Sequence, residues 1–502
     1  MKIKILIIVL SLSTVFGQSK RDPRAVAMAG AYTTIADGIF AVGYNPAMLA
    51  YQKAKPFQLM AFGTDFGFAG NYISLSNLNA LSGDTIQQDQ KDQLFRYLDN
   101  SGGLAFFTDM HVPLPFLNYS SGNMAITSNM IVMGDFKLPT GLLRLMLEGN
   151  ANNPSIDMTL KYEVMAVNEF GFSFAIPFDA FALGVTAKYL QGLFYLGVDP
   201  DSSKASLETS VLAMYGTGNY LLRQGIGGSG LGMDLGFITS EYNGWRAGLS
   251  VINAFGSITW NKPSVMKDIL AGSDNIYGNE DDLFHFTWSG ETLNDSMAIN
   301  YTYTIDSISA TNLSSDSLFK SESKLVKNLG PDGKLKDFTI NYPAMFRVGV
   351  SKRTDDYIIS SDLVASFEDR FFARQGWKWS IGFEIHRFPA VPLRIGFSWG
   401  GADLLELGLG FGFHKGPIIF DMGFAFRNGL WIHTMKGFNL STGLTITGLG
   451  GRSTGDEALT GPAPPVPEES DSDDLENGDK PEESDALEKE ADSKESLPGK
   501  EE

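Results

Sequence analysis

Residues that could carry acid–base or nucleophilic chemistry are few in this chain. It has 502 residues, five histidines and no cysteine, so it contains neither disulfides nor thiolate metal sites or nucleophiles. The polar face of one predicted strand carries Ser380, Glu384 and His386, the residue types of a hydrolase triad. Ser380 and His386 are about 20 Å apart along such a strand, too far for proton transfer. They are interpreted as polar groups facing a wet interior, and neither a catalytic residue nor an enzymatic activity is predicted.

One acidic segment has the residue types of a calcium loop. "SDNIYGNEDD", residues 273–282, is rich in Asp, Asn and Glu around a glycine, and such side chains supply oxygen ligands to Ca²⁺. The spacing does not match the EF-hand loop, so the segment is interpreted as a hydrated external loop. No metal site and no cofactor are predicted. The net charge of −19 and the absence of a basic stripe also exclude a nucleic-acid partner.

The elements that position these residues are long strands with a period of two. Trp377, Trp379 and Ile381 alternate with Lys378 and Ser380, which places apolar and polar side chains on opposite faces. The same pattern recurs at 181–189, 346–353, 393–400, 405–414, 418–427 and 438–447. A soluble sandwich has strands of about five or six residues and many charges on its outer faces. Segments of about ten residues, aromatic on one face and rich in Gly, Ser and Thr on the other, favour a transmembrane barrel.

Both ends of the chain differ from this central part. Lys2 and Lys4 precede the apolar run "ILIIVLSLSTVF", and a small-residue cleavage site precedes Gln18, which predicts a secretory signal peptide over residues 1–17. Residues 451–502 carry 18 acidic and 5 basic side chains. Too little apolar surface is present there to offset the entropy of ordering, so 449–502 are predicted to be a disordered acidic tail that could bind a periplasmic partner.

The central region, residues 57–448, is therefore predicted to be an all-β, antiparallel outer-membrane barrel in contact with lipid. It contains no uninterrupted apolar run of about 18 residues, so a spanning protein would have to be a barrel. Short connections are expected on the periplasmic side, which places the tail there and makes the strand number even. Residues 262–341 are the predicted long extracellular loop region. The charged or titratable side chains expected to line the lumen are Arg347, Lys378, Glu384, His386, Arg394, Glu406, Asp421 and Arg427.

The segment between signal peptide and barrel follows no strand or helix template. "AMAGAYTTIADGIFAVGYNPAMLA", residues 27–50, is small and apolar but interrupted by Gly and Pro. Such a segment suits close backbone packing inside a lumen, so residues 18–56 are predicted to be a plug, or hatch. Its small Gly43 and Ala47 and the turn-fixing Pro46 are the candidate gating residues, together with Asn45.

Residues 24–50, with "YNPA" at Tyr44 to Ala47, resemble the N-terminal hatch of the FadL-type outer-membrane transporters for fatty acids and other hydrophobic compounds. They equally resemble the openings of PorV-like relatives. The resemblance implies a barrel of about 14 strands and assigns Asn45, Pro46 and Ala47 to the hatch. Predicted amphipathic helices at 87–100 and 136–153 look more like an uncharacterised Bacteroidetes-type branch of this superfamily.

Two functions are consistent with these features. The first is passive transport of a hydrophobic small molecule, gated by the hatch; it is preferred because a plug is a gating element beside which an apolar pocket can form. The alternative, implied by the PorV-like resemblance, is an outer-membrane scaffold or docking subunit for secretion or surface attachment.

Overall fold

The computed structural model describes residues 22–448 with gaps, the longest of which are 309–318 and 327–336. The predicted signal peptide, residues 1–17, and the acidic tail, residues 449–502, lie outside the described residues. The chain forms two separate units, Met1–Pro462 and Ala463–Glu502. All of the described residues belong to the first unit.

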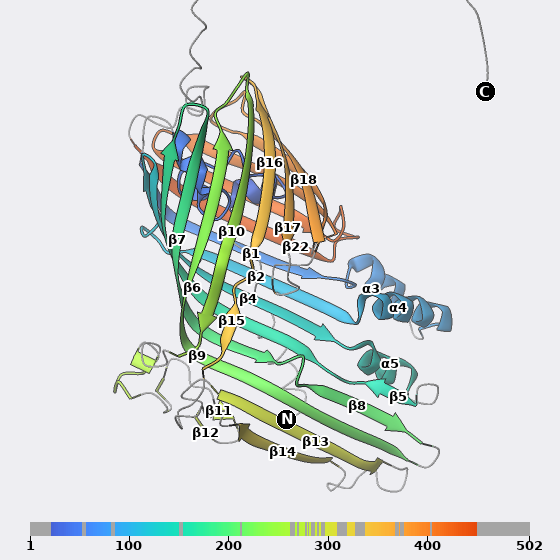
Figure 1. Cartoon of the computed structure of the whole chain (residues 1–502). Helices are drawn as coiled ribbons and strands as arrows, with labels where there is room; N and C mark the ends of the chain where they lie inside the picture. The colour runs from blue at the N-terminus through green and yellow to red at the C-terminus, as the bar shows by residue number, and fades with distance from the viewer. Residues whose placement is uncertain are drawn as a thin grey trace, which may run out of the picture. The chain divides into compact units, whose positions relative to one another are not determined.

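Fourteen antiparallel strands of the described chain close into a barrel (Figure 1). Each wall strand pairs with the next, and the last pairs with the first from Gln58 opposite Thr447 to Ala69 opposite Gly437. Closure satisfies the backbone of every wall strand without leaving an open sheet edge. The predicted barrel of about 14 strands is confirmed. In ring order the strands are β1 (Gln58–Gly70), β2 (Leu104–Pro113), β4 (Met124–Leu138), β6 (Lys161–Pro177), β7 (Phe181–Val198), β9 (Met214–Thr239), β10 (Trp245–Thr259), β16 (Met345–Arg353), β17 (Tyr357–Ser366), β18 (Gly376–Ile385), β19 (Leu393–Gly400), β20 (Leu405–Lys415), β21 (Ile418–Arg427) and β22 (Gly437–Thr447).

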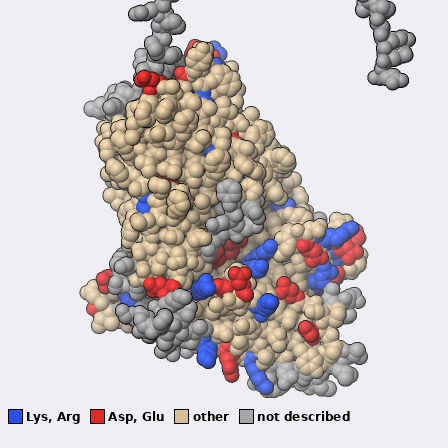
Figure 2. All heavy atoms as spheres, viewed as in Figure 1, with Lys and Arg blue, Asp and Glu red and all other residues tan. Residues whose placement is uncertain are grey.

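Period-two alternation sets the two faces of this wall. On β18, Trp377, Trp379 and Ile381 are exposed on the outside, whereas Ser380 and Glu384 are buried on the inside. Figure 2 shows a wall almost free of charged side chains, with Lys, Arg, Asp and Glu gathered mainly at one end of the barrel. The wall therefore carries the apolar outer belt that a lipid-facing barrel requires.

A charge in the middle of this belt is expected to destabilise the barrel. Ile381→Arg, at mid-strand, should cost about 2–4 kcal/mol, whereas Ile385→Arg, at the end of the same strand, should cost about 0–1 kcal/mol. The free energies of unfolding of both variants in lipid vesicles, measured by urea titration, check this difference. Equal costs at the two positions would mean that the belt is not embedded in hydrocarbon.

The connections at the two ends of the barrel differ in length. The short ones, such as 178–180, 354–356 and 416–417, share an end with the Gln58–Thr447 pair. The opposite end carries the helices α3 (Leu75–Leu81), α4 (Gln88–Ser101) and α5 (Thr140–Glu148). The helix expected within 136–153 is shorter than predicted, because residues 136–138 still belong to β4. No helix among the described residues has the length and hydropathy needed to cross a membrane.

Some strands continue the sheet beyond the barrel at the helix-bearing end. The long β9 pairs along its first half with β13 (Met297–Ile308), which in turn pairs with β14 (Phe319–Val326). Parts of the region predicted as a long loop, 262–341, thus belong to the main sheet. The other strands outside the ring are β3 (Tyr119–Ser121), β5 (Ser155–Asp157), β8 (Lys204–Thr209), β15 (Thr339–Asn341) and the separate pair β11 (Thr287–Trp288) and β12 (Glu291–Thr292).

Residues 22–52, here called the plug segment, lie inside the ring of strands (Figure 1). The segment contains α2 (Pro23–Ala27) and two 3-10 helices, η1 (Gly38–Ala41) and η2 (Pro46–Tyr51). Asp22 and Asn45 cap α2 and η2 with their side-chain oxygens. In each case a proline follows, which suits the first turn because it has no N–H to satisfy. Almost every residue of the plug segment is buried.

Candidate functional site

Glycines on the inner face of the wall let the plug segment come close. The turn at Asn45 to Ala47 lies against β7, β9 and β10. A Cβ atom built at Gly184 would lie 2.2 Å from the Ala47 backbone nitrogen, and one at Gly236 would lie 2.2 Å from Asn45 Oδ1. Neither distance is sterically possible, so only glycine permits this approach.

A second set of wall glycines receives α2. A Cβ at Gly396 would lie 2.1 Å from the Met28 carbonyl carbon, and one at Gly408 would lie 2.4 Å from the Val26 carbonyl oxygen. From the sequence, the glycine-rich inner face was interpreted as the lining of a wet lumen. In the structure, this face is the surface against which the plug segment packs. Gly382 and Gly423 make similar close approaches, to Met28 and Pro23.

The four predicted gating residues lie at or next to the wall glycines Gly184 and Gly236, which are here called the first glycine set. Asn45 is fully buried; its Nδ2 donates to the Phe237 carbonyl at 3.0 Å and its Oδ1 accepts from the Ala47 N–H at 3.1 Å. Pro46 and Ala47 begin η2. Gly43 has φ of +88°, a conformation that residues with a Cβ adopt only under strain. The structure thus places Asn45, Pro46 and Ala47 at a contact of plug and wall, with Gly43 two residues before it.

Gly236→Ala is expected to displace the turn at Asn45 to Ala47, because the new methyl group occupies the space of Asn45 Oδ1. Since the chain contains no cysteine, the displacement can be followed by labelling an introduced Ala47→Cys with a membrane-impermeant maleimide. Labelling should be faster in the Gly236→Ala background. Gly232→Ala on the same strand is the matched control, because its nearest neighbours would lie 3.7 Å from the added Cβ. Equal labelling in both backgrounds would contradict the close contact.

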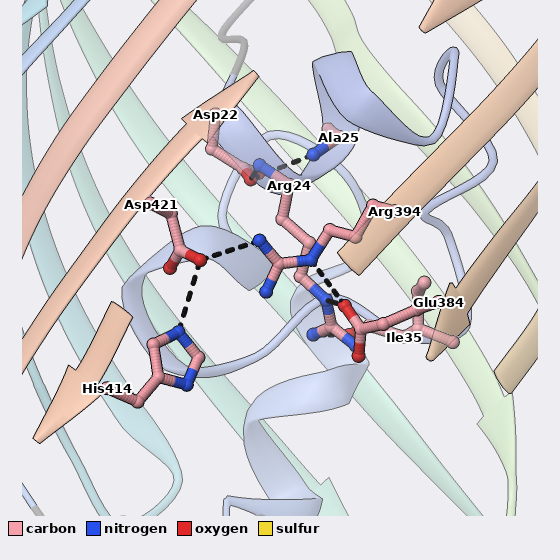
Figure 3. Close-up of polar contacts among 8 residues, drawn as sticks. All are labelled: Asp22, Arg24, Ala25, Ile35, Glu384, Arg394, His414 and Asp421. Carbon is pink, nitrogen blue, oxygen red and sulfur yellow. Dashed lines mark hydrogen bonds and ion pairs between the residues drawn. The ribbon is translucent and has the colours of Figure 1, made fainter. Parts of the chain in front are cut away.

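A buried ion network attaches α2 to the wall (Figure 3). Arg24 makes a bidentate pair with Glu384 on β18, at 2.7 Å from Nε and 2.9 Å from Nη2, and its Nη1 donates to the Ile35 carbonyl. Arg394 on β19 bridges Glu384 and Asp421, each at 2.6 Å. His414 Nε2 lies 3.1 Å from the same Asp421 oxygen. Five charged or titratable side chains from one plug helix and four wall strands therefore form one network.

The electrostatics of the plug segment follow from burial. Burial lowers the pKa of the Arg24 guanidinium, but the adjacent Glu384 carboxylate more than reverses this, so Arg24 stays charged. Burial raises the pKa of Asp22 to about 6, against the opposing effect of the Ala25 N–H. Arg24 is thus always charged. Burying this charge inside the barrel would be strongly destabilising without the paired carboxylate of Glu384.

A second attachment joins the plug segment to β16 and β17. Asp362 Oδ2 accepts from the backbone N–H groups of Tyr32 and Thr33 at 2.9 and 2.8 Å. Arg347 donates to that carboxylate at 3.0 Å and to the Gly30 carbonyl at 2.8 Å. A wall carboxylate and a wall guanidinium thus bind the backbone of the loop after α2 directly.

The remaining predicted lumen residues also lie on the inner face. Lys378 pairs with Glu406, and Arg427 pairs with Asp109 at 3.1 Å. His386 Nε2 is 3.1 Å from the Thr354 carbonyl oxygen, at the end with short connections. Instead of facing open water, the eight predicted residues are engaged in contacts within the protein. No cluster of His, Asp or Glu able to hold a metal ion occurs among the described residues.

Sequence reasoning missed several partners of these residues. Arg24, Asp109 and Asp362 were not singled out, nor was the fully buried group in which Lys188 contacts Asp234 at 2.9 Å and Glu169 at 3.3 Å. A signal was present, because each of the wall residues occupies an inward position of its strand. Inward charges on a strand need partners once the lumen is filled.

The lumen also contains an apolar layer, whose residues were not predicted. Its members are buried side chains of β4, β6, β7, β10 and β16 with neighbouring segments, and Trp260 is fully buried against glycines of β7 and β9. The lumen is therefore not polar throughout. The signal in the sequence is the loss of alternation in β4 and β6, where inward positions are Ile, Met or Val. The layer comprises Ile131, Met133, Met165, Val167, Leu190, Tyr195, Ile252, Ile258, Trp260, Ile340, Tyr342, Met345 and Phe371.

Comparison with known proteins gives one family and several similar folds. The model of a family described as "Family of unknown function (DUF5723)" matches residues 46–351. Similar solved structures include the Pseudomonas putida toluene transporter TodX, at 12% identity and TM-score 0.46, with 86% of this chain and 99% of that chain covered. The Ralstonia pickettii toluene transporter TbuX follows at 13% identity, TM-score 0.45, and 85% and 98% coverage. A Pseudomonas aeruginosa FadL homologue is similar at 11% identity and TM-score 0.42, with 86% and 99% covered. No curated protein matches the sequence.

Proposed function

The chain belongs to the DUF5723 family, and we propose that it is a passive outer-membrane channel for hydrophobic small molecules, gated by the plug segment. The apolar outer belt fits a lipid bilayer. The N-terminal resemblance to FadL-type hatches favours transport of apolar compounds. In this proposal the end with short connections, where β22 ends, faces the periplasm, and the acidic tail extends into it.

The observation that carries the proposal is the apolar layer in the lumen. The interior of a membrane barrel is ordinarily polar. The thirteen buried members of this hydrophobic cluster among the described residues therefore need a reason. Three of them, Met133, Met165 and Met345, have flexible side chains that can repack around solutes of different shape. An apolar solute entering this layer would exchange contact with water for contact with these side chains.

The plug segment is suited to be the gate because non-covalent contacts hold it in the lumen. Arg24 and the backbone at Tyr32 and Thr33 bind wall carboxylates, while Asn45 sits on the first glycine set. The wall strands pair with one another without it. The segment can therefore move while the ring of wall strands stays intact. The positions at which a substitution is expected to displace the segment most are Gly43, Asn45, Pro46 and Ala47.

Replacing Met133 and Met165 together by Gln is expected to lower uptake of a labelled aromatic hydrocarbon or long-chain fatty acid by about tenfold. The reason is that the solute loses about two methylene-sized apolar contacts, at about 0.8 kcal/mol each. Replacing both by Leu, which keeps the layer apolar, is the matched control and should retain uptake. Cells expressing each variant are compared after heat-modifiable migration has verified assembly. Unchanged uptake in the Gln variant would refute the channel and favour the scaffold role, which secretion assays on the same cells would then address.

A further inference from the structure

The ion network between α2 and the wall has one carboxylate more than it has guanidinium groups. Glu384 and Asp421 accept hydrogen bonds from the guanidinium groups of Arg24 and Arg394. Asp22, at the N-terminus of α2, is the third carboxylate of this group, and the charge of Asp421 acts on it (Figure 3). Together these five side chains carry one excess negative charge inside the barrel.

Asp22 is held by backbone groups and not by a cation. Its Oδ1 accepts from the N–H groups of Arg24 and Ala25, at 2.9 and 3.0 Å. Its Oδ2 is buried and has no hydrogen-bond partner within the described residues. Asp22 also lines a cavity of about 20 Å³, to which Ile39 and Met60 contribute apolar side chains. A cavity of this size holds about one water molecule, so an ionised carboxylate there lacks most of its hydration.

A proton on Asp22 removes this cost. Burial raises the pKa of Asp22 from its ordinary value of 3.8 to about 6, against the Ala25 N–H and the charge of Arg24, while the charge of Asp421 adds to the rise. Displacement of the plug segment into water would restore the ordinary pKa, so the segment in its lumen position binds a proton that the displaced segment releases. The lumen position is therefore firmest below about pH 4, weakens as the pH rises to about 6, and changes little above pH 7.

Other titratable side chains face this end of α2. His414 on β20 contacts Asp421, and His111 on β2 lines the cavity together with Asp22. The remaining charged side chains on the neighbouring inner faces have partners in the wall: Lys378 with Glu406, Arg427 with Asp109, and Asp65 with Asn439. Of the three carboxylates of the network, Asp22 is the one that backbone N–H groups alone bind in the described structure. Asp22 is thus the group in this set at which a proton relieves the most unfavourable charge.

We propose that protonation of Asp22 controls how firmly the plug segment is held in the lumen: the neutral acid holds the segment in place, and the ionised form favours its displacement. His414 and Asp421 lie within a few residues of the short connection 416–417, so the network extends to that end of the barrel, from which protons can reach it. The consequence for transport rests on the proposed function. If the plug segment is the gate, the channel should open more often at pH 7 than at pH 5.

The test measures how fast a membrane-impermeant maleimide labels an introduced Thr34→Cys in the full chain between pH 5 and pH 8. Thr34 is 1% exposed, and its hydroxyl has no hydrogen-bond partner in the described part of the chain. Because any thiol reacts faster as the pH rises, each rate is divided by that of an exposed Ser202→Cys at the same pH. This ratio should rise about tenfold between pH 5 and pH 7 and stay nearly constant up to pH 8.

Asp22→Asn should abolish this pH dependence, because the amide carries no charge and keeps an oxygen that can cap α2. Its labelling ratio at pH 7 should be at least about tenfold lower than that of the parent. Asp37→Asn, the same change at the N-cap of η1 in the same segment, is the matched control and should retain the tenfold rise. His414→Gln, which keeps a hydrogen-bond donor near Asp421, should retain it as well.

A parent ratio that is unchanged between pH 5 and pH 7, a rise that persists in Asp22→Asn, or a rise that either control abolishes would each overturn control by Asp22. Conductance in planar bilayers and uptake of the apolar solute are measured on the same variants. If labelling follows the pH while conductance and uptake do not, the gate of the proposed function is refuted and the proton control of the plug segment stands. The two failures are therefore distinguishable.

Discussion

Deletion of residues 28–48 is expected to turn the closed barrel into an open pore. The wall strands pair with each other around the full ring, so assembly should survive. Barrels widen with strand number, from interiors filled by side chains at about 8 strands to aqueous channels at about 16. With fourteen strands and most of the plug segment removed, single-channel conductance in planar bilayers should rise by roughly tenfold or more.

The matched comparison for this deletion is Gly43→Trp, which keeps the chain length. Gly43 has positive φ and is buried within the plug segment, so an indole there should displace the segment and raise conductance part of the way. Both variants should also show altered uptake of apolar solutes. An inserted deletion variant with wild-type conductance and uptake would rule out a gate, identify the segment as a docking element and favour the scaffold role.

Glu384→Gln is expected to release α2 from the wall. The substitution preserves the shape of the side chain but leaves the guanidinium groups of Arg24 and Arg394 without their shared carboxylate in a buried site. Removing one partner of a buried ion pair typically costs about 3–5 kcal/mol. Much of that cost can be relieved if the plug segment leaves, because Arg24 then reaches water.

The release can be measured by maleimide labelling of an introduced Ala25→Cys, which is buried in the seated plug segment. Labelling should be slow in the parent and at least about a hundredfold faster with Glu384→Gln, in line with about 3 kcal/mol. Glu406→Gln is the control, since it also breaks a buried pair, with Lys378, but that pair joins two wall strands. If both substitutions accelerate labelling equally, the effect is a general loosening of the barrel and Glu384 is not the attachment of the plug segment.

The barrel itself could be predicted from the sequence because its signal is local. Whether Trp379 and Ile381 face lipid is decided by a period of two within each strand, and every wall strand repeats that rule. The same locality explains why helices near 87–100 and 136–153 could be placed, with an error of a few residues at the start of α5. The prediction of a plug at residues 18–56 rested on composition, since small residues with Gly and Pro fit neither wall nor helix.

What fills the lumen was decided only by the tertiary structure. Arg24 meets Glu384 across 360 positions of sequence, and no local pattern specifies that pair, because it depends on ring closure and on the register of every strand between them. The lumen prediction therefore identified Glu384 and Arg394 as inward but could not identify Arg24 as their partner. The apolar layer around Trp260 and the glycine contacts of Asn45 depend likewise on which inward positions face each other across the barrel. The outside of the wall is thus determined strand by strand, whereas its inside is determined by all strands at once, since each inward side chain packs against residues from distant strands.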